Sequence, residues 1–216
     1  AGPLLAASQG KDPEIRWRAK LVLEVGKPES TKVMHAAFKV IGAEKTDGLM
    51  KELLAAVPLC DKRHLLQASL DAAEAAAVKD DADVLREALK SDNAQVRLTA
   101  ATALAAALGE DASEDLNPLF KDDEDKVKIA AARALANFGD RRSLPVLLAM
   151  LESDDLLVRV SAATAMRQLS GKHFGFAAYD TADKRQKVVA KWKEWVEGDG
   201  QTAKLNLPLK KFGAGV

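Results

Sequence analysis

Apolar side chains recur at helical spacing along most of the chain. In one segment they stand at Val96, Ala100, Ala103, Leu104 and Ala107, and in the next at Val127, Ala131, Ala134, Leu135 and Phe138. Residues spaced by three, four and seven positions share one face of an α-helix, so each stripe marks a face turned toward a hydrophobic core. No run with the alternating pattern of a β-strand competes with these segments. The pattern predicts an all-α protein.

The helical pattern is repeated at intervals of 31 residues. DNAQVRLTAATAL begins at Asp92, DEDKVKIAAARAL at Asp123 and DDLLVRVSAATAM at Asp154, with weaker copies that begin at Asp61 and Ser30. A shorter helical pattern precedes each copy and places one leucine of each in a common register: Leu23, Leu54, Leu85, Leu116 and Leu147. Two short helices cannot bury their own apolar faces, so consecutive units must stack. We expect a right-handed α-solenoid of about five two-helix repeats.

This register divides the chain into repeats and a cap. The repeats are predicted over residues 12–43, 44–78, 79–109, 110–140 and 141–171, with a cap over 172–197. Together they are expected to form a single domain, 12–197, followed by an extended, docked or disordered tail, 198–216. The open end of a solenoid needs a cap with a polar outer face. A helix over 181–197 suits this role because Trp192 and Trp195 lie on one apolar stripe.

Local signals mark where the helices begin and end. An aspartate opens each of the three clearest copies, and its side chain is expected to cap the helix N-terminus. Gly109, Gly139 and Gly171 follow these helices, where a residue in the left-handed conformation is favoured. Pro145 falls in a first turn, where no N–H is required. Pro118 falls later, so its helix is expected to start late or bend.

The repeated residues resemble a known family. The pattern D-x-x-x-V-R-x-x-A-A-x-A-L, followed by G-D and L-P-x-L-L, is similar to the HEAT repeat, and more narrowly to the short bacterial HEAT-like repeats first named from phycobilisome lyases. The resemblance is strongest over 79–171 and extends to 47–78. In that family the turn aspartate pairs with the basic residue after the valine in an adjacent repeat. The resemblance therefore implies a structural ladder made of Arg97, Lys128, Arg159, Asp92, Asp123 and Asp154.

Opposite charges balance over the whole chain but are segregated along it. Lys plus Arg and Asp plus Glu each number 32. The net charge is +2 over residues 1–60, −8 over 61–155 and +6 over 156–216. In the cap, Lys184, Lys187 and Lys191 share the face opposite the tryptophans and form a basic end. This end is the basis for an alternative function in nucleic-acid binding, and for weak self-association with the acidic middle.

No residue constellation indicates catalysis or metal binding. The chain has one cysteine, Cys60, and three histidines, His35, His64 and His173, each in a different repeat or loop. There is no HExxH motif and no pair of histidines four residues apart, so no metal site and no cofactor are expected. The acidic run near residues 110–125 lacks the glycine and the alternating ligands of an EF-hand. We expect a non-catalytic protein.

The inner surface of the solenoid is the remaining candidate site. Positions separated by the repeat length form a column on the second helices of the units: Asp71, Thr102, Arg133 and Thr164, with Lys126 beside it. This column is a candidate partner-binding surface, although a solvated face without a partner fits it equally well. We expect an interaction scaffold that presents a curved helical surface to a protein or peptide whose identity the sequence does not give.

The sequence leaves the compartment open. The longest stretch without a charged residue, 98–109, is shorter than the ~18 apolar residues that a membrane-spanning helix needs. No signal peptide is recognised. The chain does not begin with methionine, so a soluble cytoplasmic protein and a protein exported after removal of a leader both remain open.

Overall fold

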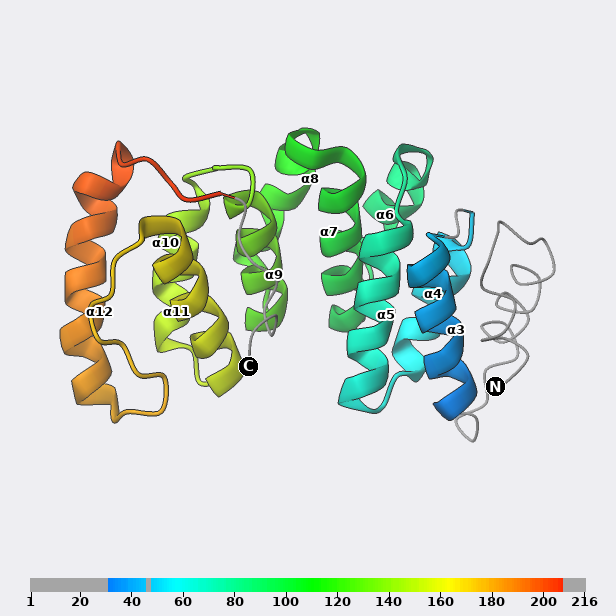
Figure 1. Ribbon diagram of the computed structural model, residues 1–216, viewed down its shortest axis with the longest axis horizontal. Helices are drawn as coiled ribbons and strands as arrows, with labels where there is room; N and C mark the ends of the chain where they lie inside the picture. Colours follow the sequence, from blue (N-terminus) through cyan, green and yellow to red (C-terminus); the bar gives the residue numbers. More distant parts are fainter. Residues whose placement is uncertain (1–30, 46–47, 208–216) are drawn as a thin grey trace. The chain divides into compact units, whose positions relative to one another are not determined.

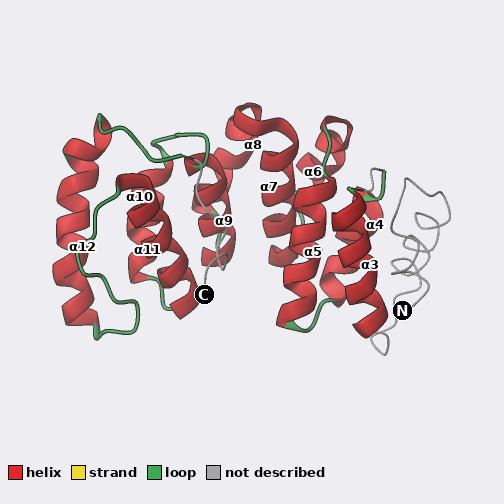
Figure 2. Ribbon diagram, in the orientation of Figure 1, coloured by secondary structure: helices red, strands yellow, loops and turns green. Residues whose placement is uncertain are grey.

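A computed structural model describes residues 31–45 and 48–207, with side chains from Met34 onward. In these ranges the chain is helical and contains no β-strand, which confirms the predicted all-α class (Figure 2). The first helix expected for repeat 12–43, with Leu23, and the tail beyond residue 207 lie outside the described residues. The chain forms two compact units, residues 1–112 and 113–216, here called unit 1 and unit 2.

Unit 1 contains two layers of helices. The longer helices α3 (Thr31–Glu44), α5 (Arg63–Ala76) and α7 (Ala94–Leu108) pack side by side in chain order (Figure 1). The shorter helices α4 (Met50–Ala56) and α6 (Ala82–Ala88) form the second layer, and the 3₁₀ turns Val57–Leu59 and Lys79–Asp81 adjoin them. Each short helix is thus followed by a long one, which is the predicted two-helix unit.

Small side chains allow the long helices of unit 1 to approach closely. Ala72, Ala73 and Ala76 of α5 are buried. Gly42 of α3 faces this row, and a Cβ added to it would lie 3.4 Å from the Cα of Ala72. Larger residues along this contact would force the two helices apart. The alanine-rich composition of the repeated segment is therefore a packing requirement.

Unit 2 continues the alternation of short and long helices and ends in a cap. Its long helices are α9 (Asp125–Ala136) and α11 (Leu156–Ser170), which pack against each other. Helix α10 (Ser143–Ala149), extended by the 3₁₀ turn Met150–Glu152, packs against both α9 and α11 and against α12 (Ala182–Glu197). The core of the unit includes Leu144, Leu147, Met166, Leu169 and Trp192, all fully buried.

Pro118 breaks the first helix of unit 2, as expected. After the 3₁₀ turn Gly109–Ala112, which ends unit 1, α8 spans only Ser113–Leu116. The chain then continues as a 3₁₀ turn, Asn117–Lys121, here called η5, with Pro118 near its start. Proline lacks the N–H that an α-helix requires at this point. The result is a short, irregular element where the neighbouring repeats have an α-helix.

The helix caps lie one residue later than predicted. Asn93 and Asp155, rather than Asp92 and Asp154, are the N-caps of α7 and α11. The carboxylate of Asp155 accepts a hydrogen bond from the N–H of Leu157 at 2.7 Å, and its own N–H donates to the hydroxyl of Ser153. In α9 the N-cap is likewise Glu124 rather than Asp123, and its N–H donates to the carboxylate of Asp122. At the other end of α11, Gly171 adopts the predicted left-handed conformation, with φ of 66°.

A segment after α12 crosses back over unit 2. This strap, residues 199–207, begins with the 3₁₀ turn Asp199–Gln201 and continues in extended conformation (Figure 1). The guanidinium of Arg141 donates hydrogen bonds to the carbonyl oxygens of Gly200 and Ala203, and the N–H of Asn206 donates to the carbonyl of Leu169 at 2.9 Å. Ala203 and Leu205 pack against the core. The strap therefore covers part of the apolar interior of unit 2.

Candidate functional site

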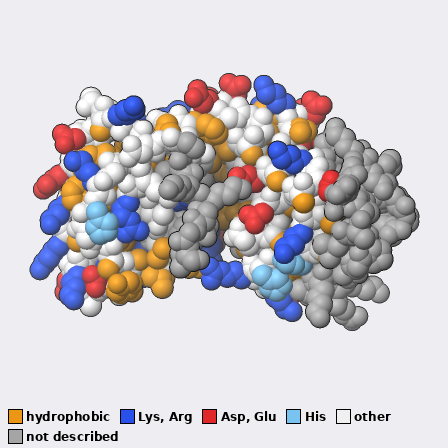
Figure 3. Space-filling view, viewed as in Figure 1, with side chains coloured by type: hydrophobic (Ala, Val, Ile, Leu, Met, Phe, Trp, Pro, Cys, Tyr) orange, Lys and Arg blue, Asp and Glu red, His pale blue; other side chains and the backbone are white. Residues whose placement is uncertain are grey.

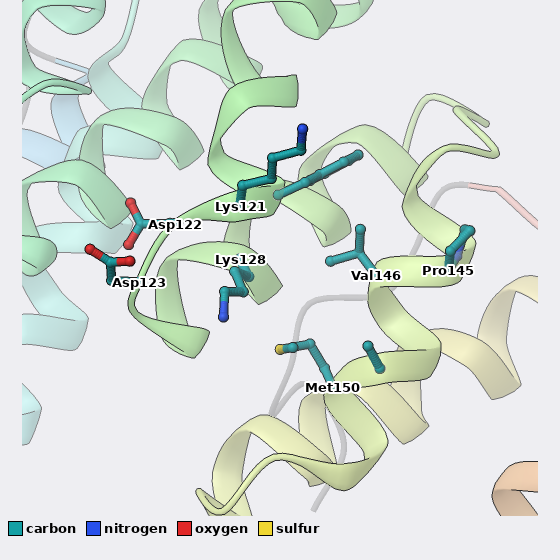
Figure 4. A pocket seen from close by; sticks show the side chains of 9 residues that line it. Lys121, Asp122, Asp123, Lys128, Pro145, Val146 and Met150 are labelled. Carbon is teal, nitrogen blue, oxygen red and sulfur yellow. The ribbon is translucent and has the colours of Figure 1, made fainter.

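A groove lies between η5 and α10 in unit 2. Its volume is about 520 Å³. Apolar side chains line much of it, namely Phe120, Pro145, Val146, Ala149 and Met150, and charged residues complete the lining, namely Lys121, Asp122, Asp123 and Lys128 (Figure 4). We call this the unit 2 groove. Its lining residues come from one pair of consecutive repeats, so it is a product of the stacking.

Local structure explains the shape of the unit 2 groove. Val146 and Met150 are four positions apart on α10 and its 3₁₀ extension, so they share one face, and Figure 4 shows both side chains on the side of the groove. On the other side, the break at Pro118 replaces a helix with the shorter η5. A regular helix at this position would present a longer apolar stripe to α10. The irregular element instead leaves a hollow.

Charges of both signs lie at the rim of the unit 2 groove, and the carboxylates at and beside it outnumber the ammonium groups of Lys121 and Lys128. Lys128 forms an ion pair with Asp125, with Nζ and Oδ1 3.0 Å apart. Asp122 accepts a hydrogen bond from the N–H of Glu124. Asp123 and Glu124 are exposed to solvent. An apolar floor beside carboxylates suits a ligand that carries an apolar group next to a positive charge.

Polar contacts join the two repeats of unit 2 at the start of their long helices. The hydroxyl of Ser153 donates a hydrogen bond to Oδ2 of Asp125 at 2.5 Å. This bond, and then the bond from Lys128, lower the pKa of Asp125 below its ordinary value. Lys126 pairs with Asp155 at 3.3 Å. Burial raises the pKa of Asp155, but the N–H of Leu157 and the ammonium of Lys126 lower it overall.

The arginines of the expected ladder bond to backbone oxygens. Arg159 donates from Nη1 to the carbonyls of Ser153 and Asp154, at 2.6 and 3.0 Å, and from Nε to the carbonyl of Ala178 at 2.8 Å. Arg97 donates in the same way to the carbonyls of Ser91 and Asp92, at 2.8 and 3.1 Å. These arginines thus close the turn that precedes their own helix. Their contribution to stability remains a prediction.

The polar contacts between repeats at the start of the long helices involve residues outside the expected ladder. Lys128 pairs with Asp125 of its own helix, three residues earlier, while Asp123 lies at the rim of the groove. At the start of the long helices, Asp125 with Ser153 and Lys126 with Asp155 reach from one repeat to the next. The sequence signal for a polar contact at this turn is a serine just before the turn aspartates, which occurs at Ser91 and again at Ser153.

The predicted column divides between the two units. In unit 1, Asp71 is exposed and accepts a hydrogen bond from Gln67, while the Thr102 hydroxyl donates to the carbonyl of Leu98. In unit 2, half-buried Arg133 of α9 reaches across to α11, where its Nη1 donates to the carbonyl of Ser161 at 3.2 Å, and burial lowers the pKa of this guanidinium.

Thr164 lies one turn beyond that carbonyl and accepts a long hydrogen bond from Arg167 at 3.4 Å. Lys126 is bound to Asp155 at the first turn of α11. The structure therefore places Arg133 and Thr164 on neighbouring long helices of unit 2, and a binding role for the column stays a prediction.

The cap helix has an apolar and a basic face. Trp192 is fully buried and Trp195 is 5% exposed. Trp192 makes edge-to-face contacts with Phe174 and Trp195, with ring centroids 4.6 and 5.9 Å apart. Phe174, which the sequence placed only in a loop, is therefore part of the core. The basic end, Lys184, Lys187 and Lys191, is exposed on α12.

Comparison with known proteins supports the repeat assignment. Residues 113–173, which span α8 to α11 of unit 2, match the family of HEAT repeats. This match supports HEAT-like repeats in the chain, within an all-helical fold. Proteins with HEAT repeats are commonly interaction scaffolds and are typically non-catalytic. No curated protein matches the sequence.

Two other classes of feature, a membrane-spanning helix and a metal centre with three or more ligands, are not found among the described residues. Over 31–45 and 48–207, no helix combines the length and the apolar character needed to cross a membrane. Within the same ranges, no group of three or more histidine, cysteine, aspartate or glutamate residues is arranged to hold a metal ion.

Proposed function

We propose that the protein is a non-catalytic scaffold that binds a protein or peptide partner. In this proposal the repeats form a right-handed α-solenoid of five two-helix units closed by α12, of the short bacterial kind first named from phycobilisome lyases. The observation that carries the proposal is the unit 2 groove, which lies inside the segment that matches HEAT repeats.

The lining of the unit 2 groove indicates the chemistry of the partner. A hollow of about 520 Å³ accommodates one or two apolar side chains, not a large folded surface. The carboxylates of Asp122 and Asp123 favour a positive charge beside that apolar anchor. The proposed ligand is therefore a peptide segment with an apolar residue next to lysine or arginine.

A peptide-library selection tests the proposal. The chain is used to select displayed peptides, and their affinities are then measured by fluorescence anisotropy. Selected peptides are expected to pair an apolar residue with a basic one. Asp122→Lys with Asp123→Lys should weaken their binding about tenfold or more, because two attractive charges become repulsive.

Two further variants distinguish binding in the unit 2 groove from binding elsewhere on the surface. Val146→Glu places a charge in the floor of the groove, whereas Leu157→Glu places the same charge on an exposed leucine outside it. Binding should be lost only in the first variant. Equal loss in both, or no enrichment of peptides, would contradict the proposal.

Nucleic-acid binding is a second candidate, favoured by the exposed basic end of α12. Phosphate contacts weaken steeply as salt rises. Retention on heparin at ~50 mM salt, lost after Lys184, Lys187 and Lys191 are changed to Glu, would support this function. If the protein is not retained on heparin, the scaffold is the one proposal that remains.

A further inference from the structure

Two histidines from consecutive repeats lie side by side on unit 1. His35 belongs to α3 and is half-buried, and His64 lies in the first turn of α5 and is exposed. Their ring centroids are 5.6 Å apart, and the ring planes make an angle of 74°. Figure 3 shows histidine side chains gathered at the surface over the region of α3 and α5. Two imidazoles this close, one from each helix, are a candidate pair of metal ligands.

We propose that His35 and His64 bind a divalent transition-metal ion, Cu²⁺ or Zn²⁺, which joins α3 to α5. The remaining coordination positions are filled by water or by an external ligand. The site is independent of the unit 2 groove, because both of its ligands belong to unit 1.

The separation of the rings suits two metal–imidazole bonds. A metal–nitrogen bond of about 2.0–2.1 Å places each ring centroid roughly 3.2 Å from the ion. Two such rings are then roughly 5.2 Å apart at a tetrahedral angle and roughly 6.4 Å apart on opposite sides of the ion. The observed 5.6 Å lies between these limits. The proposal requires that one nitrogen of each ring turn toward the shared ion by rotation about the side-chain bonds.

The surroundings affect binding in two opposing ways. A metal ion binds neutral imidazole. Burial, then the charges of Lys39 and His64, lower the pKa of His35, which favours the neutral ring. The ammonium of Lys39 also repels a cation, which limits the affinity.

The number and type of ligands select among metals. With two protein ligands the site is open, unlike the four-ligand sites that hold structural zinc. Imidazole ligands favour Cu²⁺ over Zn²⁺ and Ni²⁺, whereas Mg²⁺ and Ca²⁺ prefer oxygen. The expected order of affinity is therefore Cu²⁺, then Zn²⁺, with no detectable binding of Mg²⁺.

Calorimetric titration of the untagged chain with CuCl₂ and ZnCl₂ at pH 7.5 tests the site. The variants are His35→Gln and His64→Gln, and His173→Gln is a matched control that removes the histidine of the loop before α12. Wild type and control should bind one equivalent of Cu²⁺ with equal affinity. Each pair variant should bind about tenfold or more weakly, because one of two bonds to the ion is lost.

Two further measurements make the outcome decisive. The EPR spectrum of bound Cu²⁺ should show two imidazole nitrogens in wild type and one in His64→Gln. Cu²⁺ should raise the Tm of wild type and of His173→Gln more than that of either pair variant. Equal weakening in all three variants would show independent binding to single histidines and overturn the proposal. Absence of a one-equivalent phase in wild type would do the same. If His35→Gln does not fold, the exposed His64→Gln carries the test alone.

Discussion

At the scale of single residues, the bond between Ser153 and Asp125 joins two repeats through one buried hydroxyl and one carboxylate. Ser153 is 7% exposed, so its hydroxyl has little access to water. A hydrogen bond to a charged acceptor contributes more than one between neutral groups. Because the carboxylate must be ionised to accept it fully, the contact couples repeat packing to pH.

Ser153→Ala is expected to lower the free energy of unfolding by about 1–3 kcal/mol at pH 7. The pKa of Asp125 is lowered in the folded state, so this stabilisation is present above the ordinary value of 3.8 and is lost as the pH falls through the folded pKa. Urea unfolding of both proteins at pH 7 and pH 2.5 measures it. A difference that stays constant between the two pH values would show that the serine acts through packing alone.

Arg159→Ala is expected to destabilise unit 2 by about 1–3 kcal/mol, because three carbonyl oxygens lose a charged donor. Arg159→Lys should restore only part of this loss, since an ammonium cannot reproduce the geometry of the guanidinium fork. Arg97→Ala is the comparison in unit 1. Thermal melting of all three variants measures these effects. If Arg159→Ala melts at the same temperature as wild type, the hydrogen bonds of Arg159 do not contribute measurably to stability.

At the scale of helices, a prediction was correct where the sequence signal depended on a single residue and its own backbone. Pro118 breaks its helix and Gly171 ends one through backbone constraints that lie within the residue itself. The N-caps at Asn93 and Asp155 lie one position later than predicted, and the N–H of each bonds to the hydroxyl of a serine two residues earlier.

The candidate sites depend on distant parts of the chain and were harder to foresee. The unit 2 groove forms where two repeats meet, and the pair His35 and His64 forms because two helices approach at a particular offset. The repeat length alone gives no such offset. Side-chain direction and helix separation are needed, and neither is a property of one segment.

Trp192→Ala is expected to destabilise unit 2 by about 3–5 kcal/mol, because a fully buried indole leaves a cavity between α12, α10 and Phe174. Denaturant unfolding followed by circular dichroism gives the value. Phe174→Leu is a milder control that removes the ring contact and keeps the volume approximately filled. A silent Trp192→Ala would mean that α12 does not stabilise the last repeats.

At the scale of the whole molecule, the charge is segregated along the chain. The net charge of −8 over residues 61–155 contrasts with +6 over 156–216. The exposed Lys184, Lys187 and Lys191 form the basic end on α12, while the exposed carboxylates of Asp123 and Glu124 lie at or beside the unit 2 groove. Opposite charges on separate surfaces favour association between copies at low ionic strength.

Changing Lys184, Lys187 and Lys191 together to Glu is expected to abolish any salt-sensitive self-association without altering the fold, because all three side chains are exposed. Analytical ultracentrifugation at ~50 mM and ~500 mM salt makes the comparison, since screening shortens the range of the attraction. Lys90→Glu, an exposed lysine of unit 1, serves as the control. Association that survives the triple change would locate the contact elsewhere.

The strap also affects when the protein can finish folding during synthesis. Arg141 donates hydrogen bonds to carbonyl oxygens that are 59 and 62 residues further along the chain, so these bonds form only after that part of the chain has been made. A ribosome adds about 5–20 residues per second, so this guanidinium is made roughly 3–12 s before its acceptors. During that interval the leucines of α10 and α11 lack their final cover. Translation speed over the codons that follow Arg141 therefore affects how long this apolar surface is open to chaperones and to other nascent chains.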